Sequence, residues 1–208
     1  QLLIGSFLLR YTSCGRLCFV IMMTLIPVLV TGGIHLDGFA DTVDALSSYG
    51  DREKKLEILK DPNTGAFAVI GLCVYFLADV ALWSEVTEEL LPVIACIYML
   101  SRSLSGISVV SFQAAKNSGL LRTFQDGAQK FRVRVVLILW ACACGGGMLI
   151  LSWRTAVIVI PAALLVFLYY HRMSRKQFGG TTGDLAGYFL QVCELAMLAG
   201  AVLSRGIG

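Results

Sequence analysis

The sequence predicts an all-α, polytopic membrane protein: a transmembrane helical bundle with about six or seven spans. Hydrophobic residues make up 57% of the 208 residues and charged residues only 15%, whereas soluble domains have about 45–50% apolar and about 25% charged residues. The apolar residues come in runs close to the roughly 20 residues that cross a bilayer. Open sheet edges cannot face lipid, so these runs are expected to be helices. We expect one integral membrane domain, residues 1–208.

Each long apolar run predicts one span. The runs cover residues 17–33, 66–83, 90–112, 133–153, 155–170 and 184–204. The stretch from Leu2 to Leu9 is apolar too and predicts the end of one more helix. Because the chain begins with Gln1 and shows no signal-peptide n-region, we expect it to lack an N-terminal segment.

Basic residues in the loops predict the orientation, since Lys and Arg favour cytoplasmic loops. They gather in three loops: between the first and second runs, between the third and fourth, and between the fifth and sixth. These three loops lie on one side of the membrane if every run crosses once. These residues are Arg52, Lys54, Lys55, Lys60, Lys116, Arg122, Lys130, Arg132, Arg134, Arg172, Arg175 and Lys176. Arg10 and Arg16 fall on the opposite side, with the acidic Glu85, Glu88 and Glu89.

Other compositional features exclude some classes of site. The seven Cys residues lie mostly inside apolar runs without His partners, which favours small helix-filling residues over a zinc or disulfide framework. The net charge of +3 is small, and we expect no nucleic-acid partner. The sequence is compatible with an oligomer.

A stripe of carboxylates follows the first run. Asp37, Asp41 and Asp44 are spaced i, i+4, i+7, so on a helix they share one face. No Lys or Arg follows until Arg52, and uncompensated charge at a membrane is costly. The pattern therefore predicts a site for Mg²⁺ or Mn²⁺, for which carboxylate oxygens are suitable ligands. A solvated acidic face is the alternative. His35 lies off this face and is either a hydrogen-bonding residue at the helix start or a substrate contact.

Two loop segments on the same side carry further candidates. Asp61, before Pro62, is either an N-cap-type residue or another ligand. Residues 179–184 read Gly-Gly-Thr-Thr-Gly-Asp; glycines let the backbone approach a ligand, and successive N–H groups near a helix start bind anions. Asp184 is either the N-cap of the last helix or a metal ligand.

Three charged residues, Asp79, Arg102 and Glu194, lie within apolar runs. Intramembrane charges usually face the interior of the bundle. Arg102 either pairs with one of the two acidic residues or binds a phosphate through two parallel hydrogen bonds. Lys116 is either a second phosphate-binding cation or a topological signal.

These residues together resemble the cobalamin synthase family. The most specific match is the string GIHLDGFADTVD at 33–44. It is supported by EILKD at 57–61, GAF at 65–67, SR at 101–102, GL at 119–120, GTTGD at 180–184 and Glu194. Asn63 and Ser118 depart from the family pattern.

The resemblance implies an adenosylcobinamide-GDP ribazoletransferase of a bacterial or archaeal cytoplasmic (inner) membrane, with its active site on the cytoplasmic face. Its substrates are a corrinoid nucleotide and α-ribazole or the 5′-phosphate of α-ribazole, and its products are adenosylcobalamin (or the 5′-phosphate) and GMP. Asp37, Asp41 and Asp44 would be catalytic and would bind Mg²⁺. The expected substrate-binding residues are His35, Asp61, Arg102, Lys116, Gly180, Thr181, Thr182 and Asp184.

Two other functions remain as alternatives. A membrane phosphotransferase of the CDP-alcohol type also uses Asp-rich helices, but its string pairs Asp-Gly with Ala-Arg, whereas Phe39-Ala40-Asp41 follows Asp37-Gly38 here. A cation-coupled transporter would use Asp79, Arg102 and Glu194 near the midplane of the membrane. The sequence shows no internal repeat, and its charges are densest in the loops, which favours the enzyme.

Overall fold

The computed structural model describes residues 2–115 and 129–206, and in this part of the chain the secondary structure is helical apart from one isolated parallel bridge between Ala114 and Thr181. The helices are α1 (Leu2–Tyr11), α2 (Arg16–Thr31), α3 (Ile34–Ser47), α4 (Arg52–Ile58), α5 (Ala66–Glu85), η1 (Glu88–Leu90), α6 (Leu91–Ser111), α8 (Lys130–Leu151), α9 (Trp153–Met173), the π-helical turn η2 (Ser174–Phe178), α10 (Gly183–Leu203) and η3 (Ser204–Gly206). The predicted all-α bundle is confirmed.

Five helical segments in the described part are long and apolar enough to cross a membrane: α5, η1 with α6, α8, α9 with η2, and α10 with η3. The pair of α2 and α3 passes the same test together, which brings the number to six. The chain is a multi-pass membrane protein. α1 is apolar but, with 10 residues, too short to span the hydrocarbon.

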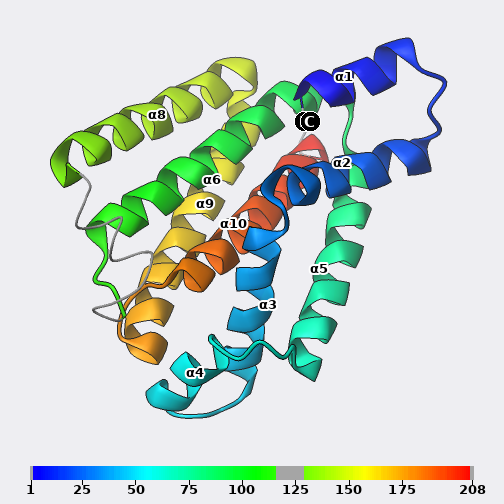
Figure 1. Ribbon diagram of the computed structural model, residues 1–208. Coiled ribbons are helices and arrows are strands. Elements are labelled where there is room, and N and C mark those ends of the chain that lie inside the picture. Colours follow the sequence, from blue (N-terminus) through cyan, green and yellow to red (C-terminus); the bar gives the residue numbers. More distant parts are fainter. Residues whose placement is uncertain (1, 116–128, 207–208) are drawn as a thin grey trace.

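The first predicted span does not run straight. α2 and α3 meet at an angle of 93° because Gly32 and Gly33 both adopt left-handed backbone angles, with φ of 64° and 79°. The N–H groups of these glycines close the end of α2 on the carbonyls of Leu29 and Val28. In Figure 1, α3 rather than α2 runs beside α5 towards α4.

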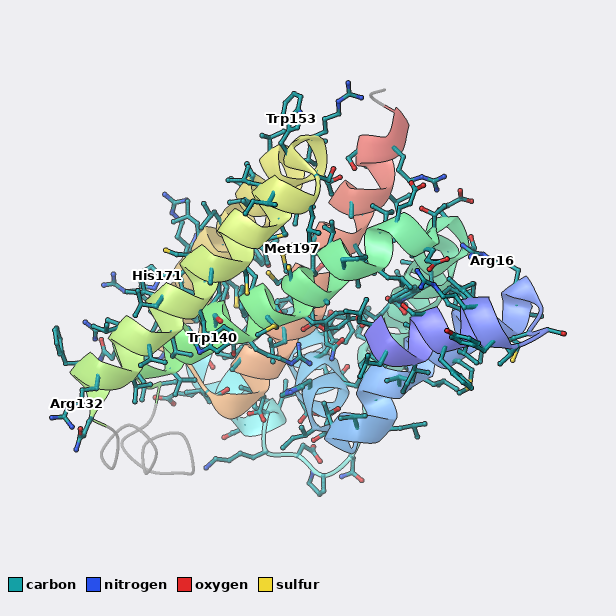
Figure 2. All side chains as sticks on the ribbon, turned by 90° about the horizontal axis from the view of Figure 1, so that it is seen from above. Arg16, Arg132, Trp140, Trp153, His171 and Met197 are labelled. Carbon is teal, nitrogen blue, oxygen red and sulfur yellow. The ribbon has the colours of Figure 1, made fainter. Side chains whose placement is uncertain are left out.

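The bundle is built around α10, which contacts α3, α5, α6 and α9 (Figure 1). Its buried residues include Phe189, Cys193 and Met197, each with 0% exposure, and Met197 lies near the centre of the view in Figure 2. α10 therefore forms the centre of the core.

The molecule has two different ends (Figure 1). We call the end that carries α4 the α4 end. There α4 contacts η2 through two hydrogen bonds: Arg52 Nε donates to the Phe178 carbonyl (2.8 Å) and Lys55 Nζ donates to Gln177 Oε1 (2.6 Å). Residue Ala114, after α6, joins this end through its bridge to Thr181. Parts of all three basic loops thus lie at one end, as the orientation rule predicts.

The opposite end, the α1 end, explains the two arginines that the predicted orientation placed there. Arg10 forms an ion pair with Glu88. Arg16 donates to the carbonyls of Trp83, Ser84 and Val86 at the C-terminus of α5, where a cation also stabilises the helix dipole. Both cations therefore have partners at this end.

Candidate active site

The predicted carboxylate stripe lies on α3, immediately after the glycine corner. Asp37 is exposed, whereas Asp41 and Asp44 are partly buried. Leu36, Phe39 and other apolar residues of α3 are buried against the bundle. The helix therefore holds its carboxylates along the edge of a packed interface rather than on a fully solvated face.

A close crossing with α10 adds a fourth aspartate. A Cβ atom on Gly38 would lie 2.7 Å from the carbonyl oxygen of Asp184, and one on Gly187 would lie 3.0 Å from the carbonyl oxygen of His35. Only glycine fits such an approach of two backbones. The crossing brings Asp184 near Asp41, and Asp37 and Asp44 lie near Asp41 on α3 itself. All three are close enough to repel the charge of Asp41. We call these four residues the carboxylate cluster.

We expect Gly38→Ala to separate α3 from α10. The added methyl meets backbone, which cannot rotate away, so the free energy of unfolding should fall by about 1–3 kcal/mol and turnover should fall with it. The matched control is Gly146→Ala in α8, where an added Cβ meets nothing within 4 Å and helix propensity favours Ala. Thermal unfolding in detergent measures both variants, and equal stability for the two would contradict the close crossing.

Asp44 has a structural contact that the sequence did not predict. Its Oδ2 accepts the Gly65 N–H (2.6 Å) and its Oδ1 accepts the Ala68 N–H (3.0 Å). These donors belong to the first turn of α5, whose N-terminal N–H groups have no partners within the helix. Asp44 therefore caps α5 from a different helix. Both of its oxygens are used in this contact, although each carboxylate oxygen can accept more than one bond.

Loss of this cap should lower stability in a graded way. Asp44→Asn keeps one carbonyl acceptor and should unfold at a temperature between those of wild type and Asp44→Ala. Asp44→Ala should lose about 0.5–2 kcal/mol, the usual range for a helix cap. Asp37→Ala is the control, because this exposed residue caps no helix. An Asp44→Ala protein as stable as Asp37→Ala would show that the cap is unimportant.

Asp61 forms a turn with Asn63 rather than capping α5. Its Oδ1 accepts the backbone N–H (2.9 Å) and the side-chain amide (2.7 Å) of Asn63. These hydrogen bonds, the backbone one first, lower the pKa of the Asp61 carboxyl. The N-cap of α5 is Gly65, so the N-cap assignment of Asp61 was wrong. Its assignment to substrate binding stays a prediction.

The glycine segment is a junction between loops in this structure. The N–H of Gly180 donates to the Ser174 carbonyl (3.0 Å) and that of Thr181 to the Gln113 carbonyl (2.8 Å). Thr181 is 1% exposed and its hydroxyl bonds that of Tyr170. The expectation that Gly180 and Thr181 present N–H groups to an anion is therefore corrected: protein carbonyls already hold both.

Thr182, rather than Asp184, caps α10. The Thr182 Oγ1 accepts the N–H of Leu185 (3.2 Å) and lies 3.3 Å from Asp184 Oδ2. Asp184 stands in the first turn of the helix, where a negative charge is stabilised by the helix dipole. The N-cap alternative for Asp184 was wrong, and the carboxylate belongs to the cluster.

Arg102 makes the interior ion pair that was one of its two predicted roles. Its Nη1 bonds Glu194 Oε1, which also accepts the hydroxyl of Ser101 (2.6 Å). The Glu194 side chain is 6% exposed and that of Arg102 40%. Arg102 also lies close enough to His35, on the first turn of α3, to act on it electrostatically. The ion pair thus adjoins the α3–α10 crossing.

The other intramembrane polar groups have different partners. Asp79 accepts the Thr24 hydroxyl (2.7 Å) instead of pairing with Arg102. Tyr75 donates to Gln191 (2.5 Å), a contact between α5 and α10 that the sequence did not predict. Lys116 and the Gly119-Leu120 pair lie outside the described residues.

The donor set can be compared with what a divalent cation needs. Within residues 2–115 and 129–206, no three His, Cys, Asp or Glu side chains converge closely enough to hold one ion. Mg²⁺ usually takes only one or two carboxylates, several waters and substrate phosphate oxygens. The cluster fits that mode of binding. That Asp37, Asp41 and Asp44 hold Mg²⁺ stays a prediction, and both oxygens of Asp44 already accept N–H groups at the start of α5.

Comparison with known proteins identifies the family. The cobalamin-5-phosphate synthase family matches residues 2–202. The chain belongs to this family. The match includes the whole carboxylate cluster, both glycines of the crossing and the Arg102–Glu194 pair. Family membership removes the CDP-alcohol and transporter alternatives.

Relatives in the family carry a common name. A protein of Lachnoclostridium phytofermentans named adenosylcobinamide-GDP ribazoletransferase is 44% identical over 93% of this chain and 74% of its own length. Proteins with that name from Clostridium perfringens (strain 13 / Type A) and Pseudomonas fluorescens (strain Pf0-1) are 30% and 31% identical over 92% and 88% of the chain, and over 76% and 74% of their own lengths. No solved structure matches the chain.

Proposed function

We propose that this chain is an adenosylcobinamide-GDP ribazoletransferase of cobalamin biosynthesis. It would join α-ribazole, or its 5′-phosphate, to adenosylcobinamide-GDP and release GMP. The observation that carries the proposal is the carboxylate cluster at the α3–α10 crossing, within a family whose relatives bear this name. A pyrophosphate substrate needs its charge neutralised, and neighbouring carboxylates with substrate phosphate oxygens can bind the cations that do so.

The proposed reaction is a phosphoryl transfer. A ribose hydroxyl oxygen attacks the phosphorus that stays on the corrinoid, the bond to the GMP oxygen breaks, and the hydroxyl proton passes to a base. Asp37, Asp41 and Asp184 are the side chains that would hold Mg²⁺, which would supply positive charge to the phosphate oxygens. A carboxylate of the cluster is suited to accept the proton. Arg102, held by Glu194 through Nη1, has further N–H donors for a phosphate.

We place the active site on the cytoplasmic face of the inner membrane. The support is the set of basic residues at the α4 end, on α4 and η2, because Lys and Arg favour the cytoplasmic side. The carboxylate cluster lies at the start of α10 and on α3, which leads to α4 (Figure 1). Water-soluble substrates would reach it from that side.

The test is direct turnover. Purified protein in detergent is incubated with adenosylcobinamide-GDP and α-ribazole, with Mg²⁺ or with excess EDTA. We expect equal amounts of GMP and a corrinoid product with Mg²⁺, and neither with EDTA. A preparation from cells without the gene is the control. Failure of folded protein to release GMP from these substrates would refute the proposed function, whereas turnover in EDTA would refute only the metal.

A further inference from the structure

A cavity at the α4 end of α9 is separate from the carboxylate cluster. It has about 400 Å³ and lies between α9 with η2 and Leu46 of α3. None of the four aspartates lines it. Its wall is apolar, with Leu165, Leu168 and Tyr169 from α9, and its rim carries Arg172 and Lys176.

We propose that this cavity binds an anionic phospholipid of the surrounding bilayer, with the headgroup phosphate at Arg172 and Lys176 and an acyl chain along Leu168 and Leu165. The proposal is independent of the reaction. It requires a ligand that is apolar at one end and negatively charged at the other, which is the chemistry of an anionic lipid.

The order of residues along α9 matches the order of groups in such a lipid. Leu165, the adjacent pair Leu168 and Tyr169, Arg172 and Lys176 recur every three or four residues, so they form a strip along one face. The strip is about 16 Å long at 1.5 Å per residue. It runs from leucines through a tyrosine, a residue typical of the membrane–water interface, to the two cations.

The apolar part of the strip is largely exposed in the described part of the chain. Leu165, Leu168 and Tyr169 are 66%, 42% and 48% exposed, and they belong to a helix that is long enough to span the membrane. In a bilayer such side chains face acyl chains. The occupant of this wall is therefore lipid rather than water.

The two cations have no protein partner among the residues that the structure describes. Within the described residues, the side chains of Arg172 and Lys176 take part in no hydrogen bond or ion pair. Their neighbours differ: Arg52 and Lys55 bond Phe178 and Gln177 and hold η2 against α4. η2 is a π-helical turn, a distortion that frequently marks a functional position. An anionic headgroup would complement the charge that the protein leaves unmatched.

Native mass spectrometry of the purified protein tests the proposal with phosphatidylglycerol and phosphatidylcholine of identical chains. We expect preferential binding of phosphatidylglycerol, weakened roughly 30-fold by the double variant Arg172→Gln/Lys176→Gln, the loss given by two cations near an anionic headgroup. Lys130→Gln/Arg132→Gln is the matched control. It removes the same charge from exposed positions at the start of α8 that do not line the cavity. Arg132 projects from the outer end of α8 (Figure 2). It should change binding less than about twofold.

A second variant tests the contribution of the apolar wall to lipid binding separately from that of the two cations. Leu168→Trp fills the cavity but keeps both cations, and it should weaken phosphatidylglycerol binding without unfolding the protein, because the side chain is exposed. Glycerol 3-phosphate, which has the phosphate without acyl chains, should not displace the lipid at equal concentration. Equal losses in the two double variants, unchanged binding in Leu168→Trp, or displacement by glycerol 3-phosphate would each overturn the proposed lipid site.

Discussion

Replacing Asp41 with Asn should remove almost all turnover while the protein still folds. The substitution keeps the size of the side chain and removes the charge that lies nearest to Asp37, Asp44 and Asp184. A cation shared with the substrate would lose a ligand, and loss of one such electrostatic contribution lowers kcat roughly 10²–10³-fold. GMP release and corrinoid product, measured over a range of Mg²⁺ concentrations, give the result.

The stability of the Asp41→Asn protein should not fall with its activity. Removing one of four neighbouring negative charges lowers their mutual repulsion, so the yield and the unfolding temperature of Asp41→Asn should equal or exceed those of wild type. Glu53→Gln, an exposed acidic residue on α4, is the control and should keep full activity. Near-normal turnover of Asp41→Asn at low Mg²⁺ would rule out a metal role for the cluster.

Breaking the ion pair between Arg102 and Glu194 should have the largest effect on stability. Removing one partner of a buried pair usually costs about 3–5 kcal/mol, since it leaves an uncompensated charge. Arg102→Gln leaves Glu194, which is 6% exposed, without its cation, and should approach that range. Glu194→Gln leaves Arg102, which is less buried than Glu194 at 40% exposure, so the expected loss is smaller, about 2 kcal/mol.

The double variant Arg102→Gln/Glu194→Gln separates the two roles of the pair. Two neutral amides can hydrogen-bond each other, so unfolding in detergent should show a smaller loss than the sum of the single variants. Activity should stay low if Arg102 also binds a substrate phosphate, because no guanidinium remains. Recovery of both stability and turnover in the double variant would show that the pair is structural only.

The main features of the fold and the positions of the charged groups could be predicted from composition and spacing. Apolar runs locate helices because lipid demands internal backbone hydrogen bonds. The interior pairing of Arg102 was one of two predicted roles because buried charge needs a partner. The choice of Glu194 over Asp79 could not be predicted, since it depends on which faces of α6 and α10 meet.

Contacts between segments that are far apart in the chain could not be predicted from the sequence. The run 17–33 has the composition of a span, and only the two adjacent glycines at its end indicated the 93° corner. Asp44 reads as a third member of a metal stripe, yet it caps a helix that begins some twenty residues later. The glycines at 179–180 suggest an anion site, but the carbonyls of Ser174 and Gln113 already occupy the N–H groups of Gly180 and Thr181.

The contact of Gly38 with Asp184 also has a consequence for biogenesis. α3 is synthesised well before α10, because Asp184 lies 146 residues after Gly38 in the chain. At about 5–20 residues per second, roughly ten to thirty seconds of synthesis separate the two sides of the crossing. Throughout that time Gly38 and the aspartates of α3 lack the helix that packs against them. The capping of α5 by Asp44 can form soon after α5 is made, but the α3–α10 crossing can form only after α10 has been synthesised.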